Sequence, residues 1–148
     1  MGREKRILVI DDDEAIRMLL FTVLRRRGFA VDRARNGEEA IEAMQRCRYT
    51  VALVDLMMPV KSGWEVLDWL AAQPKSDRPL AIVLTAGAVF QAMHPEVVAG
   101  TIRKPFDVEL LLDIVGACTA GREAEQRSEC PPAQSNHARE RPRGSDVN

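Results

Sequence analysis

Three wholly apolar runs constrain the fold of this 148-residue chain more than any other feature of its sequence. Residues 7–10, 51–54 and 80–84 carry no polar side chain on either face, which is typical of strands inside a parallel sheet that is covered by helices on both sides. Residues 29–34 and 101–105 also have strand character. The charges of 29–34 favour an exposed edge strand, and 101–105 is expected to form the second edge strand. Helical patterns alternate with these five strands, so we expect a doubly wound α/β sheet.

The helices between the strands are predicted from their capping residues and apolar spacing. One begins at Glu14, and a second follows Asn36 as its cap. Residues 62–65 read Ser-Gly-Trp-Glu, which is the spacing of a capping box, and Asp107 is expected to cap the last helix. Residues 88–100 carry little helical signal and contain a proline, so we expect at most a short or irregular fourth helix there.

Size and composition favour one domain, which we place at residues 5–118. The chain is 46% hydrophobic, whereas residues 119–148 are rich in Arg, Glu, Pro, Ser and Gln and are expected to form a disordered tail or a linker. No apolar run is long enough to span a membrane, and residues 1–6 do not resemble a signal sequence. We therefore expect a cytoplasmic protein without a membrane partner. The net charge of −1 gives no reason to expect direct nucleic-acid binding.

Polar residues follow four of the five predicted strands. Asp11 and Asp12 follow the first strand, Asp55 follows the third, Thr85 follows the fourth, and Lys104 ends the fifth. Right-handed crossovers, with edges at the second and fifth strands, give the strand order 2-1-3-4-5, and its switch point lies between the first and third strands. A single Asp after a strand more often caps a turn. Five polar or charged residues gathered at one rim of the sheet indicate a binding site instead.

Three carboxylates at one rim repel one another, and a divalent cation would relieve the conflict. Mg²⁺ suits the predicted site because it binds a few carboxylate oxygens and keeps positions open for phosphate. We expect Asp12 and Asp55 to be direct ligands of Mg²⁺ and Asp11 to be a ligand through water. Asp55 could then attack a phosphoryl group and hold it as an acyl phosphate, while the ammonium of Lys104 and the hydroxyl of Thr85 stabilise the phosphoryl oxygens.

With these five residues at the ends of four predicted strands, the chain resembles the receiver domain of two-component response regulators over about residues 5–118. The resemblance implies a flavodoxin-like fold and a phosphorelay protein in which Asp55 is phosphorylated from a phosphohistidine. The donor would be a sensor histidine kinase or a histidine phosphotransfer protein. The resemblance also implies that the main-chain carbonyl of Met57 completes the protein ligands of Mg²⁺, and that the output is a contact with a downstream protein.

The chain departs from this family at the residues that transmit phosphorylation. Most receivers carry an aromatic residue three positions before the lysine, and its side chain swings inward as the threonine moves; this chain has Thr101 at that position. The segment between Thr85 and Lys104 is also a few residues shorter than is usual in the family. We therefore expect an atypical switch at Thr85 and Thr101, with signalling through a different surface or through local ordering of residues 88–100.

Two other functions stay open at this point. Phosphatases and phosphomutases of the haloacid dehalogenase type also use an aspartyl phosphate and Mg²⁺, but they usually place a second Asp two residues after the nucleophile. Met57 holds that position here and cannot transfer protons. A receiver-like binding module that is never phosphorylated is the second alternative. We expect no enzymatic activity beyond the protein's own phosphorylation and dephosphorylation, in either a stand-alone regulator or a fragment of a longer one.

Overall fold

Five parallel strands form one sheet in the order β2-β1-β3-β4-β5, which confirms the predicted topology. The structure is a computed structural model and describes residues 5–87 and 94–120. Its elements, in chain order, are β1 (Arg6–Ile10), α1 (Glu14–Arg26), β2 (Ala30–Ala34), α2 (Gly37–Arg46), β3 (Val51–Asp55), α3 (Gly63–Ala71), a 3₁₀ turn (Lys75–Asp77), β4 (Leu80–Thr85), β5 (Val98–Arg103) and α4 (Val108–Ala120).

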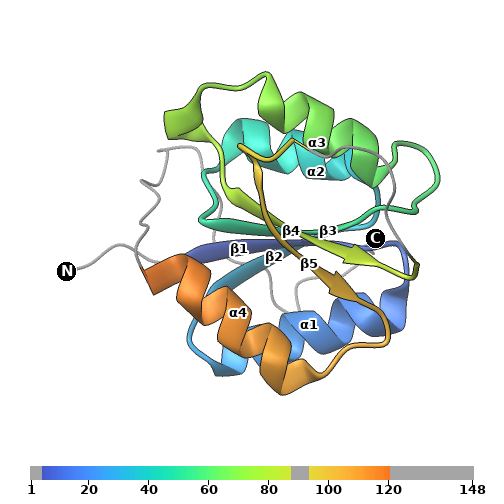
Figure 1. Cartoon of the computed structure of the whole chain (residues 1–148), viewed down its shortest axis with the longest axis vertical. Helices are drawn as coiled ribbons and strands as arrows, with labels where there is room; N and C mark the ends of the chain where they lie inside the picture. Colours follow the sequence, from blue (N-terminus) through green and yellow to red (C-terminus); the bar gives the residue numbers. More distant parts are fainter. Residues whose placement is uncertain (1–4, 88–93, 121–148) are drawn as a thin grey trace, which may run out of the picture.

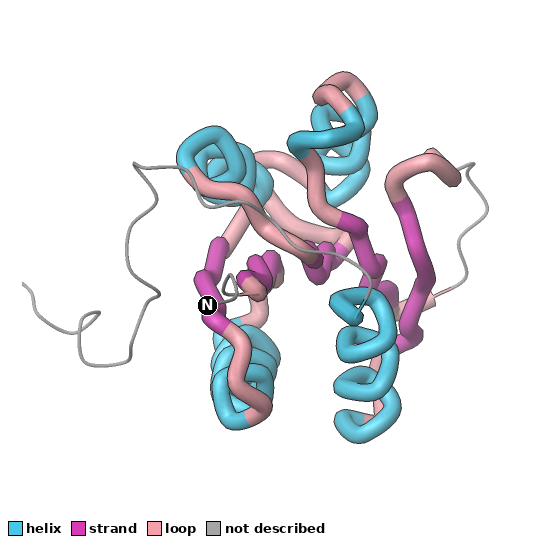
Figure 2. The backbone as a smooth tube through the Cα atoms, turned by 90° about the vertical axis from the view of Figure 1, so that its left-hand side faces the viewer, coloured by secondary structure: helices cyan, strands magenta, loops and turns pink. Residues whose placement is uncertain are grey.

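The helices cover the sheet in two layers, with α1 and α4 on one face and α2 and α3 on the other (Figures 1 and 2). Successive residues of a strand point to opposite faces, so each central strand contributes to both layers. Leu8 and Ile10 of β1 pack in the cluster under α2 and α3, whereas Ile7 and Val9 pack in the cluster under α1 and α4. Double coverage explains why the interior strands are apolar throughout.

The second strand lies at an edge as predicted, but its charges do not mark an exposed strand. Asp32 is only 4% exposed, because its carboxylate accepts hydrogen bonds from Arg6 Nε (3.2 Å) and from the hydroxyl of Tyr49 (2.6 Å). Burial, together with the neighbouring Asp32 carboxylate, raises the pKa of the Tyr49 phenol. The expectation of exposure was therefore wrong, because partners from two other segments compensate the buried charge.

The predicted caps position three of the helices. Asn36 Oδ1 accepts a hydrogen bond from the Glu39 amide at the start of α2 (2.9 Å). Ser62 and Glu65 form a reciprocal capping box at the start of α3. The carboxylate of Asp107 accepts from two amides of the first turn of α4. These caps fix where each helix begins after its loop.

The fifth strand begins at Val98, three residues earlier than predicted. In its pairing with β4, Gly100, a poor strand former, lies opposite Ile82, and Ala99 is the extra residue at a register irregularity between Ala81 and Ile82. Of the segment where we expected a short helix, residues 88–93 lie outside the described residues and 94–97 form a turn. At the other end, α4 continues to Ala120, two residues into the expected tail. No helix among the described residues has both the length and the apolar character needed to cross a membrane.

Candidate functional site

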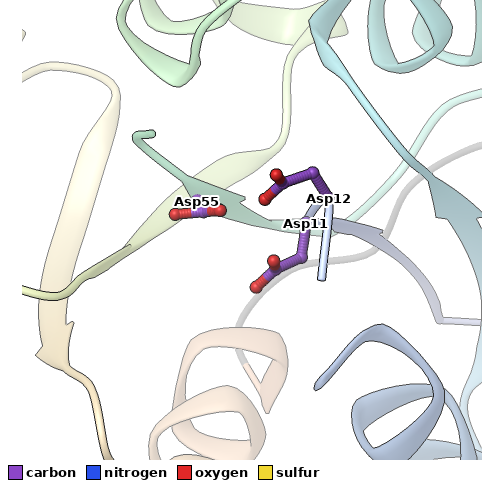
Figure 3. A group of neighbouring side chains, drawn as sticks. All are labelled: Asp11, Asp12 and Asp55. Carbon is purple, nitrogen blue, oxygen red and sulfur yellow. The ribbon is translucent and has the colours of Figure 1, made fainter. Parts of the chain in front are cut away.

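Three carboxylates meet at the carboxyl ends of β1 and β3 (Figure 3). Asp11 and Asp12 follow β1, and Asp55 is the last residue of β3. One oxygen from each of the three side chains lies within 4.8 Å of the other two. Asp11 is fully buried and Asp55 is 5% exposed, whereas Asp12 is open to solvent. The strand order therefore brings together residues that are more than forty positions apart.

Lys104 joins the carboxylates from the end of β5. Its Nζ donates to Asp11 Oδ2 at 3.0 Å and lies 3.5 Å from Asp55 Oδ1. Its main-chain amide donates to the carbonyl of Thr85 (2.7 Å), and the peptide bond between Lys104 and Pro105 is cis. Burial lowers the pKa of Lys104, but the hydrogen bond and charge of Asp11, with the charge of Asp55, outweigh it and raise the pKa. The side chain therefore stays a cation at the centre of the acidic group.

The environment of Asp55 disfavours its ionised form. Burial and the charge of Asp11 raise the pKa of Asp55 to about 7, although the charge of Lys104 and a hydrogen bond from the Met57 amide (3.3 Å) oppose the rise. A single ammonium does not compensate two buried carboxylates and a third at the surface. Additional positive charge beside these carboxylates would offset the repulsion between them.

The threonine at the end of β4 faces its own loop. Thr85 is 5% exposed, and its Oγ1 lies 3.0 Å from the carbonyl oxygen and 3.2 Å from the amide nitrogen of Gly87. Thr101 pairs with Val83 of β4 and is exposed on β5. The structure thus places Thr85 at the same rim as the carboxylates, with its hydroxyl hydrogen-bonded to the loop, and it places Thr101 at the surface.

Where the loop from β3 meets α3, the backbone of Gly63 lies in close contact with the backbone of Asp55. A Cβ at Gly63 would overlap the carbonyl oxygen of Asp55 and would lie 2.6 Å from Leu56 Cα. The first residue of α3 therefore rests directly on the main chain of Asp55. In the same loop the side chain of Met57 is 71% exposed, and Val60 is 72% exposed with a φ of 66°, a left-handed conformation that is uncommon for a β-branched residue.

Two residues near the start of α1 were missed in the sequence, Asp13 in the β1–α1 loop and Arg17 in the helix itself. Asp13 caps α1 by accepting from the amides of Ala15 (2.9 Å) and Ile16 (3.2 Å), and its own amide donates to Asp11 Oδ1 (2.9 Å). Arg17 Nη1 donates to the main-chain carbonyl of Asp11 (2.9 Å). The position of Asp13 just before a helical pattern is a signal for the cap. No local pattern reveals the contact of Arg17.

The donor set fits Mg²⁺. The gathered side-chain ligands are carboxylate oxygens, which is the chemistry that this ion prefers. Burial and the charge of Asp11 raise the pKa of Asp55, so a cation bound beside it would favour its ionised form. Asp11, Asp12 and Asp55 are therefore the residues that could hold the ion.

Comparison with known proteins gives a consistent family assignment. The sequence model of the response regulator receiver domain matches residues 7–116, a range that contains all five site residues. Protein Rrf1 of Nitratidesulfovibrio vulgaris is 35% identical over 115 residues, which are 78% of this chain and 83% of Rrf1. The transcriptional regulatory protein ResD of Bacillus subtilis is 43% identical over 83 residues, but this match covers 56% of the chain and only 33% of ResD.

Solved structures share the fold. The response regulator TrrA of Thermotoga maritima, in complex with Mg²⁺ and BeF, superimposes with a TM-score of 0.68 at 32% identity and covers 77% of this chain and 98% of TrrA. The chemotaxis protein CheY4 of Vibrio cholerae gives a TM-score of 0.67 at 26% identity and covers 78% of this chain and 98% of CheY4. The likeness extends over nearly the whole of both solved chains.

Proposed function

This chain belongs to the response regulator receiver domain family, and on that premise we propose that Asp55 accepts a phosphoryl group from a phosphohistidine of a partner protein. The partner would be a sensor histidine kinase or a histidine phosphotransfer protein. One observation carries the proposal: Asp55 ends β3 beside two further carboxylates and within 3.5 Å of the Lys104 ammonium. A carboxylate nucleophile with a cation at its side is the arrangement that phosphoryl transfer to Asp requires.

The reaction forms one bond and breaks one. An oxygen of Asp55 attacks the phosphorus, the bond from phosphorus to the histidine nitrogen breaks, and its electron pair returns to the imidazole ring. Mg²⁺, held by Asp11, Asp12, Asp55 and the main-chain carbonyl of Met57, would supply positive charge against the incoming phosphoryl oxygens. Within the chain itself, Lys104 would bind a phosphoryl oxygen, and its position between Asp11 and Asp55 supports this role.

The output is proposed to be a protein contact made through an atypical switch. To reach a phosphoryl group on Asp55, the hydroxyl of Thr85 must leave Gly87, which frees the start of the β4–β5 connection. Thr101 is too small to fill the space that an aromatic residue would occupy, so the response would be a local change between β4 and β5. Amide hydrogen exchange of the full chain, measured with and without beryllofluoride, tests this; identical protection throughout the connection would exclude the switch.

Phosphorylation itself is tested with a small phosphodonor. Wild-type protein and Asp55→Asn are incubated with acetyl phosphate and Mg²⁺, and the adduct is followed by intact mass and by its lability to hydroxylamine. We expect a labile adduct on wild type that needs Mg²⁺ and disappears in Asp55→Asn. No adduct on wild type would favour the phosphorylation-independent module, and repeated turnover of a phosphate ester that depends on Asp55 would favour a phosphatase.

A further inference from the structure

Both main-chain polar groups of Asp11 have fixed partners. Its amide donates to the carbonyl of Ala34 in β2 (3.1 Å), and its carbonyl accepts from Arg17 Nη1 (2.9 Å). Arg17 lies in the first turns of α1, where helical side chains point back toward the helix start and so toward the end of β1. The guanidinium therefore fixes one end of the peptide group that joins Asp11 to Asp12.

The three carboxylates differ in how they are held. Asp11 is bound through its side chain by Lys104 and by the amide of Asp13, and Asp55 is the last residue of a fully buried strand. The carboxylate of Asp12 is exposed, and within residues 5–87 and 94–120 no side chain or amide donates to it. Its direction therefore depends on the backbone of the loop, which Arg17 holds at the preceding carbonyl.

We propose that Arg17 is a positioning residue for the acidic cluster: by binding the Asp11 carbonyl it orients the peptide between Asp11 and Asp12 and keeps the Asp12 carboxylate directed toward Asp55. The proposal rests on the proposed function, because its purpose is a cluster ready to bind Mg²⁺. Groups that orient metal ligands without touching the metal commonly change metal affinity by about ten- to a hundredfold when they are removed. Arg17 would be such a group for this chain.

The charge and the hydrogen bond of Arg17 act in opposite directions on metal binding. A cation near the cluster repels a divalent ion, so loss of the charge alone would strengthen Mg²⁺ binding. Loss of the hydrogen bond frees the Asp11 carbonyl and lets Asp12 turn away, which would weaken Mg²⁺ binding. The direction of the change therefore separates a positioning role from a purely electrostatic one.

The test uses the full chain with Arg17→Met, Arg17→Lys and the control Arg26→Met, which removes an exposed arginine from the last turn of the same helix. Circular dichroism verifies the fold of each variant. The Mg²⁺ dissociation constant is measured by calorimetric titration with MgCl₂, and amide exchange of Asp12 and Asp13 is measured by NMR without metal. Arg17→Met should weaken Mg²⁺ binding by about tenfold and speed exchange of the Asp13 amide, with Arg17→Lys in between and Arg26→Met unchanged.

Unchanged or tighter Mg²⁺ binding by Arg17→Met would overturn the proposal, as would unchanged exchange at Asp13. If Arg17→Met does not fold, Arg17→Lys decides on the same two measurements, because it keeps the charge and loses the planar guanidinium. Failure of the proposed function looks different: wild type itself would then neither bind Mg²⁺ nor accept a phosphoryl group. A wild type that does both beside an unaffected Arg17→Met counts against the role of Arg17 alone.

Discussion

Asp55→Asn should make the metal-free protein more stable at mildly alkaline pH, although it removes the proposed phosphoacceptor. Asp55 is 5% exposed, and burial together with the Asp11 carboxylate raises its pKa from 3.8 to about 7. The folded protein therefore binds a proton at Asp55 more tightly than the unfolded chain does. Stability from this group is fully present below the unfolded pKa and is lost as the pH rises from about 4 to about 7. An asparagine keeps the shape of the protonated side chain and avoids the loss.

The size of the effect follows from the pKa. One pKa unit corresponds to about 1.4 kcal/mol, so a rise from 3.8 to about 7 sets an upper limit of about 4 kcal/mol. The open side of the cluster, where Asp12 meets solvent, screens the repulsion and reduces the effect. We therefore expect a gain of about 2 kcal/mol in the free energy of unfolding above the raised pKa.

Urea denaturation in EDTA, at about pH 8 and about pH 5, measures the difference between Asp55→Asn and wild type. The gain should be smaller at the lower pH, because wild-type Asp55 is then mostly protonated in the folded state. Asp113→Asn, which removes an exposed carboxylate from α4, serves as the control for lost charge. Adding Mg²⁺ should stabilise wild type more than Asp55→Asn. Equal stability of the two proteins in EDTA at the higher pH would refute this account of the cluster.

Three further substitutions test the loops and the buried network by chemical denaturation. Val60→Gly should stabilise the fold by about 1 kcal/mol, since Val60 has a φ of 66° and an exposed side chain, and a loss of stability would contradict a strained backbone. Gly63→Ala should cost about 2 kcal/mol because its Cβ overlaps the Asp55 carbonyl, whereas Gly116→Ala, with open space around its Cβ, should be neutral or stabilising. Tyr49→Phe should lower the free energy of unfolding by about 1–3 kcal/mol, because it removes a hydrogen-bond donor from the buried Asp32. In wild type the Tyr49 phenol should ionise above its ordinary pKa of 10. A phenol that titrates at its ordinary pKa would argue against the contact with Asp32.

Local chemistry made the strands and caps predictable. The apolar runs have no polar face for solvent, so they predict buried strands. Asn36 and Ser62 predict the starts of their helices, because their side chains accept hydrogen bonds from amides only three positions away. The meeting of Asp11 and Asp55 also followed from sequence, because a doubly wound sheet places all strand ends at one rim. These features depend on periodicity and topology and need no knowledge of tertiary contacts.

Features that depend on distant partners could not be predicted. Asp32 looked exposed because its partners, Arg6 and Tyr49, are 26 and 17 positions away in the chain. The contact of His94 has no local signal either, because its Nε2 lies 2.8 Å from Asp68 Oδ1, which is 26 positions away on α3. The start of β5 was misplaced because Gly100 suggests a break in isolation and is held in the strand only by pairing with β4.

The sheet also divides the interior into two compartments whose side chains never mix. Neighbouring residues such as Leu8 and Val9 belong to different compartments, with the strand backbone as the wall between them. Free-energy changes in one compartment should therefore add to those in the other, because additivity holds for sites without shared partners. Over evolution, side chains in the cluster under α2 and α3 can therefore be substituted without changing the packing under α1 and α4, and the converse also holds.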